Sequence, residues 1–236
     1  MKWKEEWKIF EGVFDQGTLK TLYKLLNDGY IEQINGIIAT GKEADVFHGI
    51  GQEGKEIAIK IYRYETSNFQ SMLKYVNGDH RFSSAKLSKR DIIPIWAKKE
   101  FKNLELAAKA GIPVPKPITS RRNVLVMEFI GENGKSAPIA KFFPPKNPKM
   151  WLQKILNSIK ALYQKEGLVH GDLSEYNILN FNERPVIIDL GQGVVKDHPA
   201  ANELLMKDIE NILKWFKKLK VDVPEAKSFY KEVIKK

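Results

Sequence analysis

A change of pattern along the chain restricts its fold more than any other feature. Residues 34–62 run in three short stretches rich in β-branched residues, INGIIAT, ADVFHGI and EIAIKIY, which are separated by turns that contain glycine. This pattern predicts an antiparallel meander. The second half instead carries apolar residues at helical spacing, over 148–165 and again from Ala200 onward. We therefore expect an α+β protein with a strand-rich lobe followed by a mainly helical one.

Two further helices are predicted from spacing and stop signals. Residues 18–28 carry leucines at helical spacing and end at Gly29. Residues 94–110 place an apolar stripe on one helix face, with Gly111 at the C-cap and Pro113 beyond it. Residues 63–90 show no convincing period, and we expect part of them to be mobile. The chain is thus divided into a helical extension over 1–30, an N-lobe over 31–130 with a flexible loop at about 77–90, and a C-lobe over 131–236.

Composition excludes several classes of function. The 236 residues are 43% apolar, enough for a substantial core, and contain no cysteine, which excludes disulfides, thiolate metal sites and a cysteine nucleophile. A reducing, cytoplasmic setting is therefore favoured. The longest apolar runs, such as VLVMEFI, are too short to span a bilayer, so no membrane association is expected. The net charge of +10 suits a polyanionic partner such as RNA, and it equally suits a lysine-rich solvated surface.

The strand EIAIKIY predicts a lysine at a nucleotide site. Its three isoleucines face one side by period two, so Ala58 and Lys60 share the other. There Ala58 leaves room for a flat base, and Lys60 reaches toward phosphate oxygens. Glu100 and Glu105, on the helix 94–110, are both candidates to pair with this lysine. The alternative is an ordinary solvent-facing lysine on a half-buried strand.

A glycine-containing turn precedes that strand. GIIATGKE, residues 36–43, matches seven positions of the P-loop pattern, but Glu43 occupies the eighth, where a hydroxyl is needed for magnesium. The segment also lies between two predicted strands, whereas a P-loop runs from a strand into a helix. We therefore predict a strand–turn–strand phosphate cover, in which Gly41 lets the backbone approach a triphosphate and Thr40 and Lys42 add donors.

The stretch LVHGDLSEYNIL, residues 168–179, carries the predicted chemistry. Asp172 and Asn177 lie five positions apart between apolar flanks, and Asp189 follows in IIDLG. Carboxylate and amide oxygens are hard ligands that suit Mg²⁺ or Mn²⁺, so Asn177 and Asp189 are predicted to hold the metal. Asp172 would accept a proton from the nucleophile that attacks the γ-phosphate. A turn-capping aspartate or a left-handed asparagine explains either residue singly, but not all three in order after Lys60.

These motifs resemble the protein-kinase-like superfamily: IAIK its β3 lysine strand, HGDLSEYN its catalytic loop and DLG its metal-binding motif. The departures are specific. Gly171 replaces the usual arginine, and Ser174 replaces the catalytic-loop lysine. No A-P-E sequence follows Asp189, which lies near the end of the sequence, so we expect no full peptide-docking lobe.

ATGKEADVF, LVHGDLSEYNIL, IIDLGQGV and DHPAANELL together resemble the RIO family of atypical serine/threonine kinases over residues 13–219. The similarity is to the subfamily without an N-terminal winged helix, the RIO-one type, in an archaeal-like minimal form. The resemblance implies an α+β, two-lobed minimal protein-kinase-like fold. Its N-lobe would contain an antiparallel sheet plus helices, and its mainly helical C-lobe would lack the peptide-docking helices.

The resemblance also implies roles for individual residues. Lys60 would bind phosphates with Glu100 as its helix partner. Met127 would lie at the back of the base pocket, with backbone groups of Glu128 and Ile130 facing adenine. Asp172 would be the catalytic aspartate, and Asn177 and Asp189 the metal ligands. Residues 77–90 would form the family's flexible loop, with autophosphorylation at Ser83, Ser84 or Ser88.

Family membership implies serine/threonine kinase activity with ATP and Mg²⁺ or Mn²⁺, and ATP hydrolysis through a phospho-aspartyl intermediate at Asp189. It further implies a role in late maturation of the small ribosomal subunit, with the subunit precursor and its rRNA as partners. Two alternatives remain. HGDL and IID also occur in small-molecule kinases of the aminoglycoside or choline kinase type, although the short C-terminal region leaves little protein for an acceptor pocket. A ribosome-assembly binding module with a relic nucleotide site is the other, and the intact catalytic positions argue against it.

Overall fold

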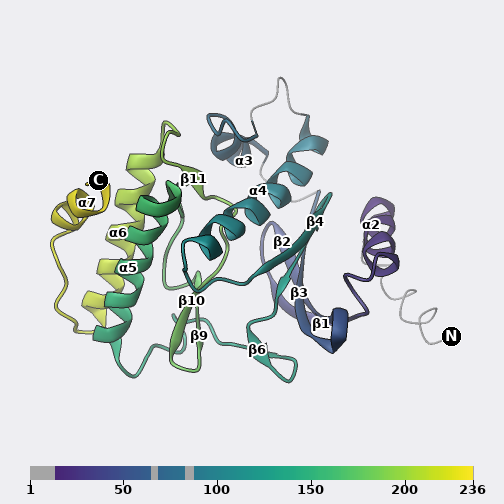
Figure 1. Cartoon of the computed structure of the whole chain (residues 1–236), viewed down its shortest axis with the longest axis horizontal. Coiled ribbons are helices and arrows are strands. Elements are labelled where there is room, and N and C mark those ends of the chain that lie inside the picture. Colours follow the sequence, from purple (N-terminus) through teal and green to yellow (C-terminus); the bar gives the residue numbers. More distant parts are fainter. Residues whose placement is uncertain (1–13, 65–68, 83–87, 236) are drawn as a thin grey trace.

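The computed structural model describes residues 14–64, 69–82 and 88–235, which form two lobes (Figure 1). The N-lobe contains a five-stranded sheet in the order β1-β2-β3-β5-β4, with every neighbouring pair antiparallel. Its strands are β1 (Gln33–Thr40), β2 (Ala44–Ile50), β3 (Glu56–Tyr62), β4 (Pro117–Arg121) and β5 (Val124–Glu128). The predicted meander is therefore confirmed, and a short 3₁₀ helix, η1 (Gln52–Gly54), joins β2 to β3.

Helices α2 (Gln16–Asn27) and α4 (Lys89–Lys109) lie on opposite sides of this sheet (Figure 1). Asp15 is the N-cap of helix α2, and its carboxylate accepts from the Gly17 and Thr18 N–H groups. Its buried leucines pack on the three isoleucines of β3. Helix α4 instead lies between the sheet and the C-lobe helices, so the face of β3 that carries Lys60 looks toward α4.

The polar stretch 63–90 contains more regular structure than expected. Residues Phe69–Val76 form helix α3, and α4 begins at Lys89, ahead of the predicted start. Ser88 and Asp91 form a capping box that starts α4 early. Pro94 lies inside the helix and removes one backbone hydrogen bond without ending it.

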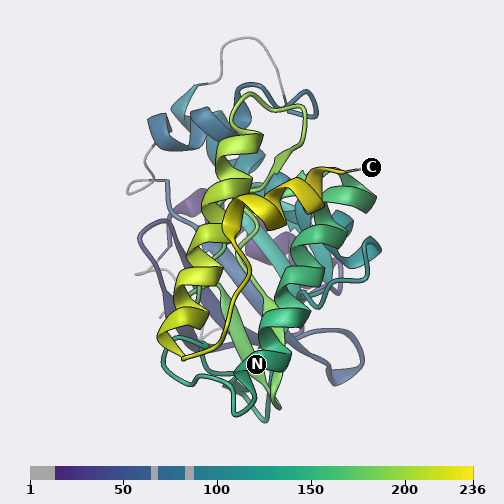
Figure 2. The same ribbon diagram turned by 90° about the vertical axis from the view of Figure 1, so that its left-hand side faces the viewer.

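The C-lobe is built on helices α5 (Pro148–Glu166), α6 (Ala201–Lys218) and α7 (Ala226–Ile234), which pack against one another (Figure 2). Small antiparallel pairs complete it: β8 (Leu168–Val169) with β11 (Val194–Val195), and β9 (Ile178–Phe181) with β10 (Arg184–Ile187). The hairpin of β6 (Gly131–Glu132) and β7 (Lys135–Ser136) joins the lobes. The two-lobed α+β fold is therefore confirmed, and no helix among the described residues has the length and apolar character needed to cross a bilayer.

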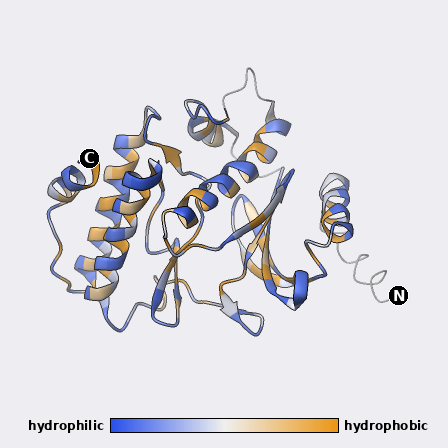
Figure 3. Ribbon diagram, in the orientation of Figure 1, coloured by the Kyte–Doolittle hydropathy of each residue, from blue (hydrophilic) through white to orange (hydrophobic). Residues whose placement is uncertain are grey.

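The largest buried cluster extends through both lobes. Leu104 of α4 and Leu125 of β5 belong to the same cluster as the inner faces of α5, α6 and α7. Each of these helices carries both hydrophobic and hydrophilic residues (Figure 3), and the buried apolar ones make up the shared cluster. The active-site candidates described below therefore lie on elements that share one continuous core.

Candidate active site

Lys60 connects the two lobes through a pair of carboxylates. Its Nζ donates to both carboxylate oxygens of Glu100, at 2.9 Å each, and to Oδ1 of Asp189 at 2.9 Å. The side chains of Lys60 and Glu100 are 11% and 1% exposed. Glu105, the other predicted partner, instead pairs with Lys102 at the surface, at 2.6 Å. Residue spacing alone left both glutamates open as partners of Lys60, and in the structure the partner is Glu100.

Charge keeps this lysine protonated. Burial alone lowers the pKa of Lys60, but the carboxylates of Asp189 and Glu100 outweigh burial and raise the pKa above its usual range. In return, the Lys60 ammonium lowers the pKa of Asp189. Lys60 is consequently a fixed positive charge at the lobe boundary, and Asp189 is an ionised carboxylate whose side chain is 53% exposed.

Asp189 has a left-handed backbone with φ 62°, just after strand β10. Aspartate tolerates this conformation better than most residues, but it still has to be held by its surroundings. Asn177 lies beside the same strand, because the Ile188 N–H donates to the Asn177 carbonyl at 3.0 Å. Asp189 and Asn177 therefore approach one another from two separate loops.

The Asn177 side chain is oriented for a metal ion. Its Nδ2 donates to the Asp172 carbonyl at 2.8 Å, so its Oδ1 is the atom left to bind a cation together with Asp189. Nowhere in the described part of the chain do three or more His, Asp or Glu side chains gather as a metal cage. Two protein oxygens, completed by phosphate and water, are the arrangement that Mg²⁺ commonly adopts at nucleotide sites. The residues thus fit a phosphate-bound Mg²⁺ ion.

A buried aspartate that was not predicted from the sequence holds the loop around Asp172. Asp208 of α6 accepts from the Gly171 N–H at 2.8 Å and from the Leu173 N–H at 2.7 Å, on either side of Asp172. It is 2% exposed, and burial raises its pKa to about 6. The available signal was an acidic residue on the buried stripe of an amphipathic helix. Asp208 therefore fixes the backbone that carries the Asp172 carboxylate.

The structure explains why glycine stands at position 171 in place of the usual arginine. Its φ is 83°, and a Cβ added there would lie 2.8 Å from the Gln192 carbonyl oxygen. Real Cβ atoms do not approach this closely, and the left-handed φ also favours glycine. The backbone before Asp172 therefore admits no side chain at this position.

Two further side chains reach the Asp172 carboxylate. Gln192 donates to Oδ2 at 3.4 Å, and the Lys207 ammonium lies 3.6 Å from Oδ1. Sequence reasoning identified neither residue, because both come from segments that approach the loop only in the folded chain. Asp172 itself is 40% exposed and keeps access to solvent.

The predicted base pocket lies where β3 and β5 pair. Ala58 pairs with Met127, and Ala58 is 5% exposed. The Glu128 N–H donates to the Lys116 carbonyl, and the Ile130 carbonyl accepts from Ala137. The Ile130 N–H has no backbone partner among the described residues, so this donor is available to a base at this edge.

The turn between β1 and β2 is the predicted phosphate cover. Thr40, Gly41 and Lys42 are exposed there, between two antiparallel strands, so the strand–turn–strand prediction is confirmed. Glu43, which the sequence analysis treated only as a mismatch to the P-loop pattern, faces the site. Burial raises its pKa, and the charge of Asp189 raises it further. This carboxylate is thus a third acidic group near Lys60, beside Glu100 and Asp189.

The serines proposed for autophosphorylation are only partly described. Ser83 and Ser84 lie outside the described residues. Ser88 is exposed at the start of α4, where its Oγ donates to Asp91 at 2.5 Å.

The arrangement as a whole is suited to phosphoryl transfer: a fixed ammonium, two oxygens that fit a metal ion and an exposed carboxylate meet at one lobe boundary. A model of the RIO domain matches residues 45–229. The RIO-type serine/threonine-protein kinase Rio1 of Haloferax volcanii is 40% identical over 99% of this chain and 80% of its own length. That of Methanocaldococcus jannaschii is 42% identical over 98% and 79%.

A solved structure supports the fold. The crystal structure of the Rio2 kinase-ADP/Mg²⁺-phosphoaspartate complex from Chaetomium thermophilum has a TM-score of 0.67 at 24% identity, and the match covers 89% of this chain and 64% of that one. The family model and the curated relatives show that the chain belongs to the RIO family, and within it to the Rio1 type.

Proposed function

We propose that this protein is an ATP-dependent serine/threonine protein kinase of the RIO type that also hydrolyses ATP. The observation that carries the proposal is the joint placement of Lys60, Asn177 and Asp189 beside the open carboxylate of Asp172. Phosphoryl transfer depends mainly on positioning and on charge stabilisation, and this site supplies both. The names of the relatives, at about 40% identity over nearly the whole chain, support the same activity.

The residues divide the chemistry between them. Lys60, held by Glu100, binds phosphate oxygens of ATP as a fixed charge. Asn177 and Asp189 would hold Mg²⁺, which supplies neutralisation of the phosphate charge when bound. Asp172 accepts the hydroxyl proton as the acceptor oxygen bonds to the γ-phosphorus, while the bond to the ADP oxygen breaks.

A second route uses Asp189 as the acceptor. Its ionised, half-exposed carboxylate would attack the γ-phosphorus, release ADP and form an acyl phosphate, which water then hydrolyses. The phosphoaspartate named for the Rio2 structure supports this route by analogy. Hydrolysis by this path would make the protein an ATP-driven switch.

The proposed cellular role is late maturation of the small ribosomal subunit in the cytoplasm, with the subunit precursor and its rRNA as partners. The net charge of +10 supports contact with RNA. Binding to an rRNA fragment should then weaken steeply as salt rises, because each lysine–phosphate contact releases a counterion.

The deciding experiment uses ATP labelled at the γ-phosphate and compares wild type with Asp172→Asn and Asp189→Asn. Acid-stable label on serine that disappears in Asp172→Asn would support the kinase. Hydroxylamine-labile label that disappears in Asp189→Asn would support the acyl phosphate. The surface variant Asp222→Asn is the matched control and should behave as wild type. If wild type neither transfers nor releases phosphate with Mg²⁺, the proposal fails.

A further inference from the structure

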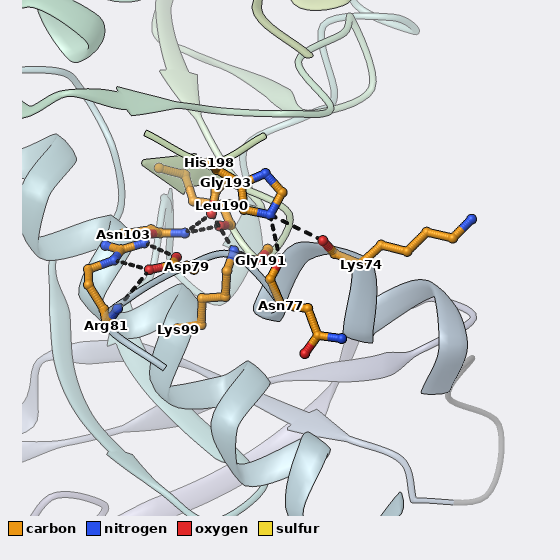
Figure 4. Close-up of polar contacts among 10 residues, drawn as sticks. All are labelled: Lys74, Asn77, Asp79, Arg81, Lys99, Asn103, Leu190, Gly191, Gly193 and His198. Atoms are coloured by element: carbon orange, nitrogen blue, oxygen red, sulfur yellow. Dashed lines mark hydrogen bonds and ion pairs between the residues drawn. The ribbon is translucent and has the colours of Figure 1, made fainter. Parts of the chain in front are cut away.

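A buried polar cluster lies behind the loop that follows Asp189 (Figure 4). Lys99 of α4 donates from Nζ to the Gly191 carbonyl at 2.9 Å and also to the Gly193 carbonyl. Asn103, one turn further along α4, donates from Nδ2 to the Leu190 and Gly193 carbonyls, each at 2.8 Å. Both donors are 0% exposed. Helix α4 therefore holds this loop through three backbone carbonyls, those of Leu190, Gly191 and Gly193.

The two glycines of this loop are required by the close approach of α4. A Cβ added to Gly191 would lie 2.9 Å from Nε1 of Trp96, and one added to Gly193 would lie 2.9 Å from Nδ2 of Asn103. A side chain at either position would push the loop away from the helix. The pattern DLGQG is consequently a helix contact as well as a metal-ligand motif.

A second layer fixes the direction of the Asn103 amide. Arg81 donates from Nη2 to the Asn103 Oδ1 at 2.9 Å, so the Asn103 nitrogen points to the loop carbonyls. Arg81 itself is held by Asp79 through two hydrogen bonds of 2.9 and 2.7 Å, and Asp79 is 0% exposed. The orientation of Asn103 is thus determined by its partners on both sides.

The same cluster is anchored to the C-lobe through His198 (Figure 4). Its Nδ1 accepts from the Ala200 N–H at 3.1 Å, so Nε2 carries the proton and donates to the Asn77 carbonyl at 2.9 Å. This bond holds the segment that contains Asp79 and Arg81. Residues 77–82, which follow α3, are therefore connected to both α4 and the C-lobe.

We propose that Lys99 and Asn103 are positioning residues for Asp189, which fix the backbone of the metal-ligand loop against α4 before any ligand binds. Glu100 lies between them in the sequence and holds Lys60, which in turn holds the Asp189 carboxylate. One turn of α4 thereby sets both the backbone and the side chain of the metal ligand. Helix and loop should consequently move as one unit.

Hydrogen exchange in the ligand-free protein tests this directly. The variants are Lys99→Met and Asn103→Leu, which keep the side-chain volume but remove the donors. Amides of residues 190–195 should exchange about tenfold faster or more in both variants, because the loop opens locally. Lys98→Met, the same change at the exposed neighbouring position, should leave that exchange unchanged. Wild-type exchange of the loop in both buried variants would overturn the proposal.

The second measurement rests on the proposed function. It distinguishes a role of Lys99 in positioning Asp189 from a general role in stabilising the fold. The affinity for ATP is measured with Mg²⁺ and with EDTA. In Lys99→Met, the increase in ATP affinity that Mg²⁺ provides should be about tenfold smaller than in wild type, because mutation of a residue that supports a metal ligand typically weakens metal binding to that extent. The affinity for ATP in EDTA should change less than twofold. An equal loss in both conditions would mean a general structural role and would overturn the proposal. If wild type binds no ATP at all, the proposed function fails, and loop exchange still decides the positioning role.

Discussion

Burial of Lys99 lowers the stability of the folded state, although the same side chain holds the loop after Asp189. Its ammonium is fully buried among neutral carbonyls, and burial lowers its pKa to about 7, although Asp79 raises it. In the unfolded chain the pKa returns to the ordinary 10.5. Between these values the unfolded state binds more protons than the folded state, so the folded state gains stability as pH rises.

This difference in pKa predicts that the free energy of unfolding depends on pH, and that Lys99→Met removes this dependence. From pH 7 to 9.5 the free energy of unfolding should gain on the order of 3 kcal/mol from Lys99, and this gain is lost again as the pH falls back from 9.5 to 7. Urea unfolding at the two pH values measures it. Lys99→Met should lack this gain, whereas Lys98→Met should retain it. A wild-type gain in Lys99→Met would show that the buried amine does not titrate in this range.

Two glycines with nearly the same left-handed φ have different surroundings. Gly171 and Gly111 have φ of 83° and 81°, but a Cβ at Gly111 would meet nothing within 4 Å. Gly111→Ala should therefore cost only the left-handed strain, about 1 kcal/mol, with unchanged phosphotransfer. Gly171→Ala should cost about 2–4 kcal/mol and reduce the rate, because the clash with Gln192 displaces the neighbouring Asp172. Thermal unfolding and labelled-ATP assays on both variants check this, and equal effects would contradict it.

The sequence was sufficient for residues whose chemistry is encoded locally. Lys60, Asp172, Asn177 and Asp189 each sit in a short motif with fixed spacing, and the structure brings all four together. Asp208 and the Lys99–Asn103 pair were missed for a common reason. Their partners are backbone N–H or C=O groups from distant segments, and every residue type carries those groups, so no pairing pattern appears in the sequence.

At the scale of elements, prediction succeeded where a helix is long and has clear stop signals. Helix α5 was predicted within one residue, because Asn147 caps its start and Gly167 adopts the left-handed conformation at its end. Helix α3 was missed since it has only eight residues between polar segments. Strand β4 begins at a proline and alternates weakly, and its neighbour β5 rather than its own sequence determines that it forms a strand.

Helix α7 depends on a contact that its own sequence does not supply. Gln164 of α5 donates from Nε2 to the carbonyls of Glu232, Val233 and Lys235, the last at 3.0 Å, which satisfies the C-terminal end of α7. Gln164→Leu should leave those carbonyls to solvent and destabilise α7 locally by about 1 kcal/mol.

Hydrogen exchange over Ala226–Ile234 measures this effect. Gln153→Leu is the control, because Gln153 lies on the same helix and bonds instead to Asn157, within α5. Exchange in α7 should rise in Gln164→Leu alone. Equal exchange in both variants would mean that Phe229 and Val233, which are buried in the core, hold α7 without the polar contact.

For the whole molecule, the continuity of the core determines how it unfolds. A two-lobed protein would unfold in two steps if each lobe had its own core and a weak interface. Here Leu104 and Leu125 from the N-lobe side share one buried cluster with α5, α6 and α7. The polar contacts from Lys60 and Lys99 to the loop after β10 also cross this boundary. Separating the lobes would therefore expose apolar surface and leave buried charges without partners.

We accordingly predict a single calorimetric transition, with a calorimetric enthalpy equal to the van't Hoff enthalpy. Mg²⁺ and ATP together should shift the whole transition upward, by about 2.7 kcal/mol of stabilisation at a free ligand concentration one hundred times Kd, because ligand that bridges both lobes binds only the intact fold. Asp189→Asn should unfold in the same single step but lose most of the Mg²⁺-dependent shift. Two resolved transitions, of which ligand moves only one, would show that the shared cluster does not couple the lobes.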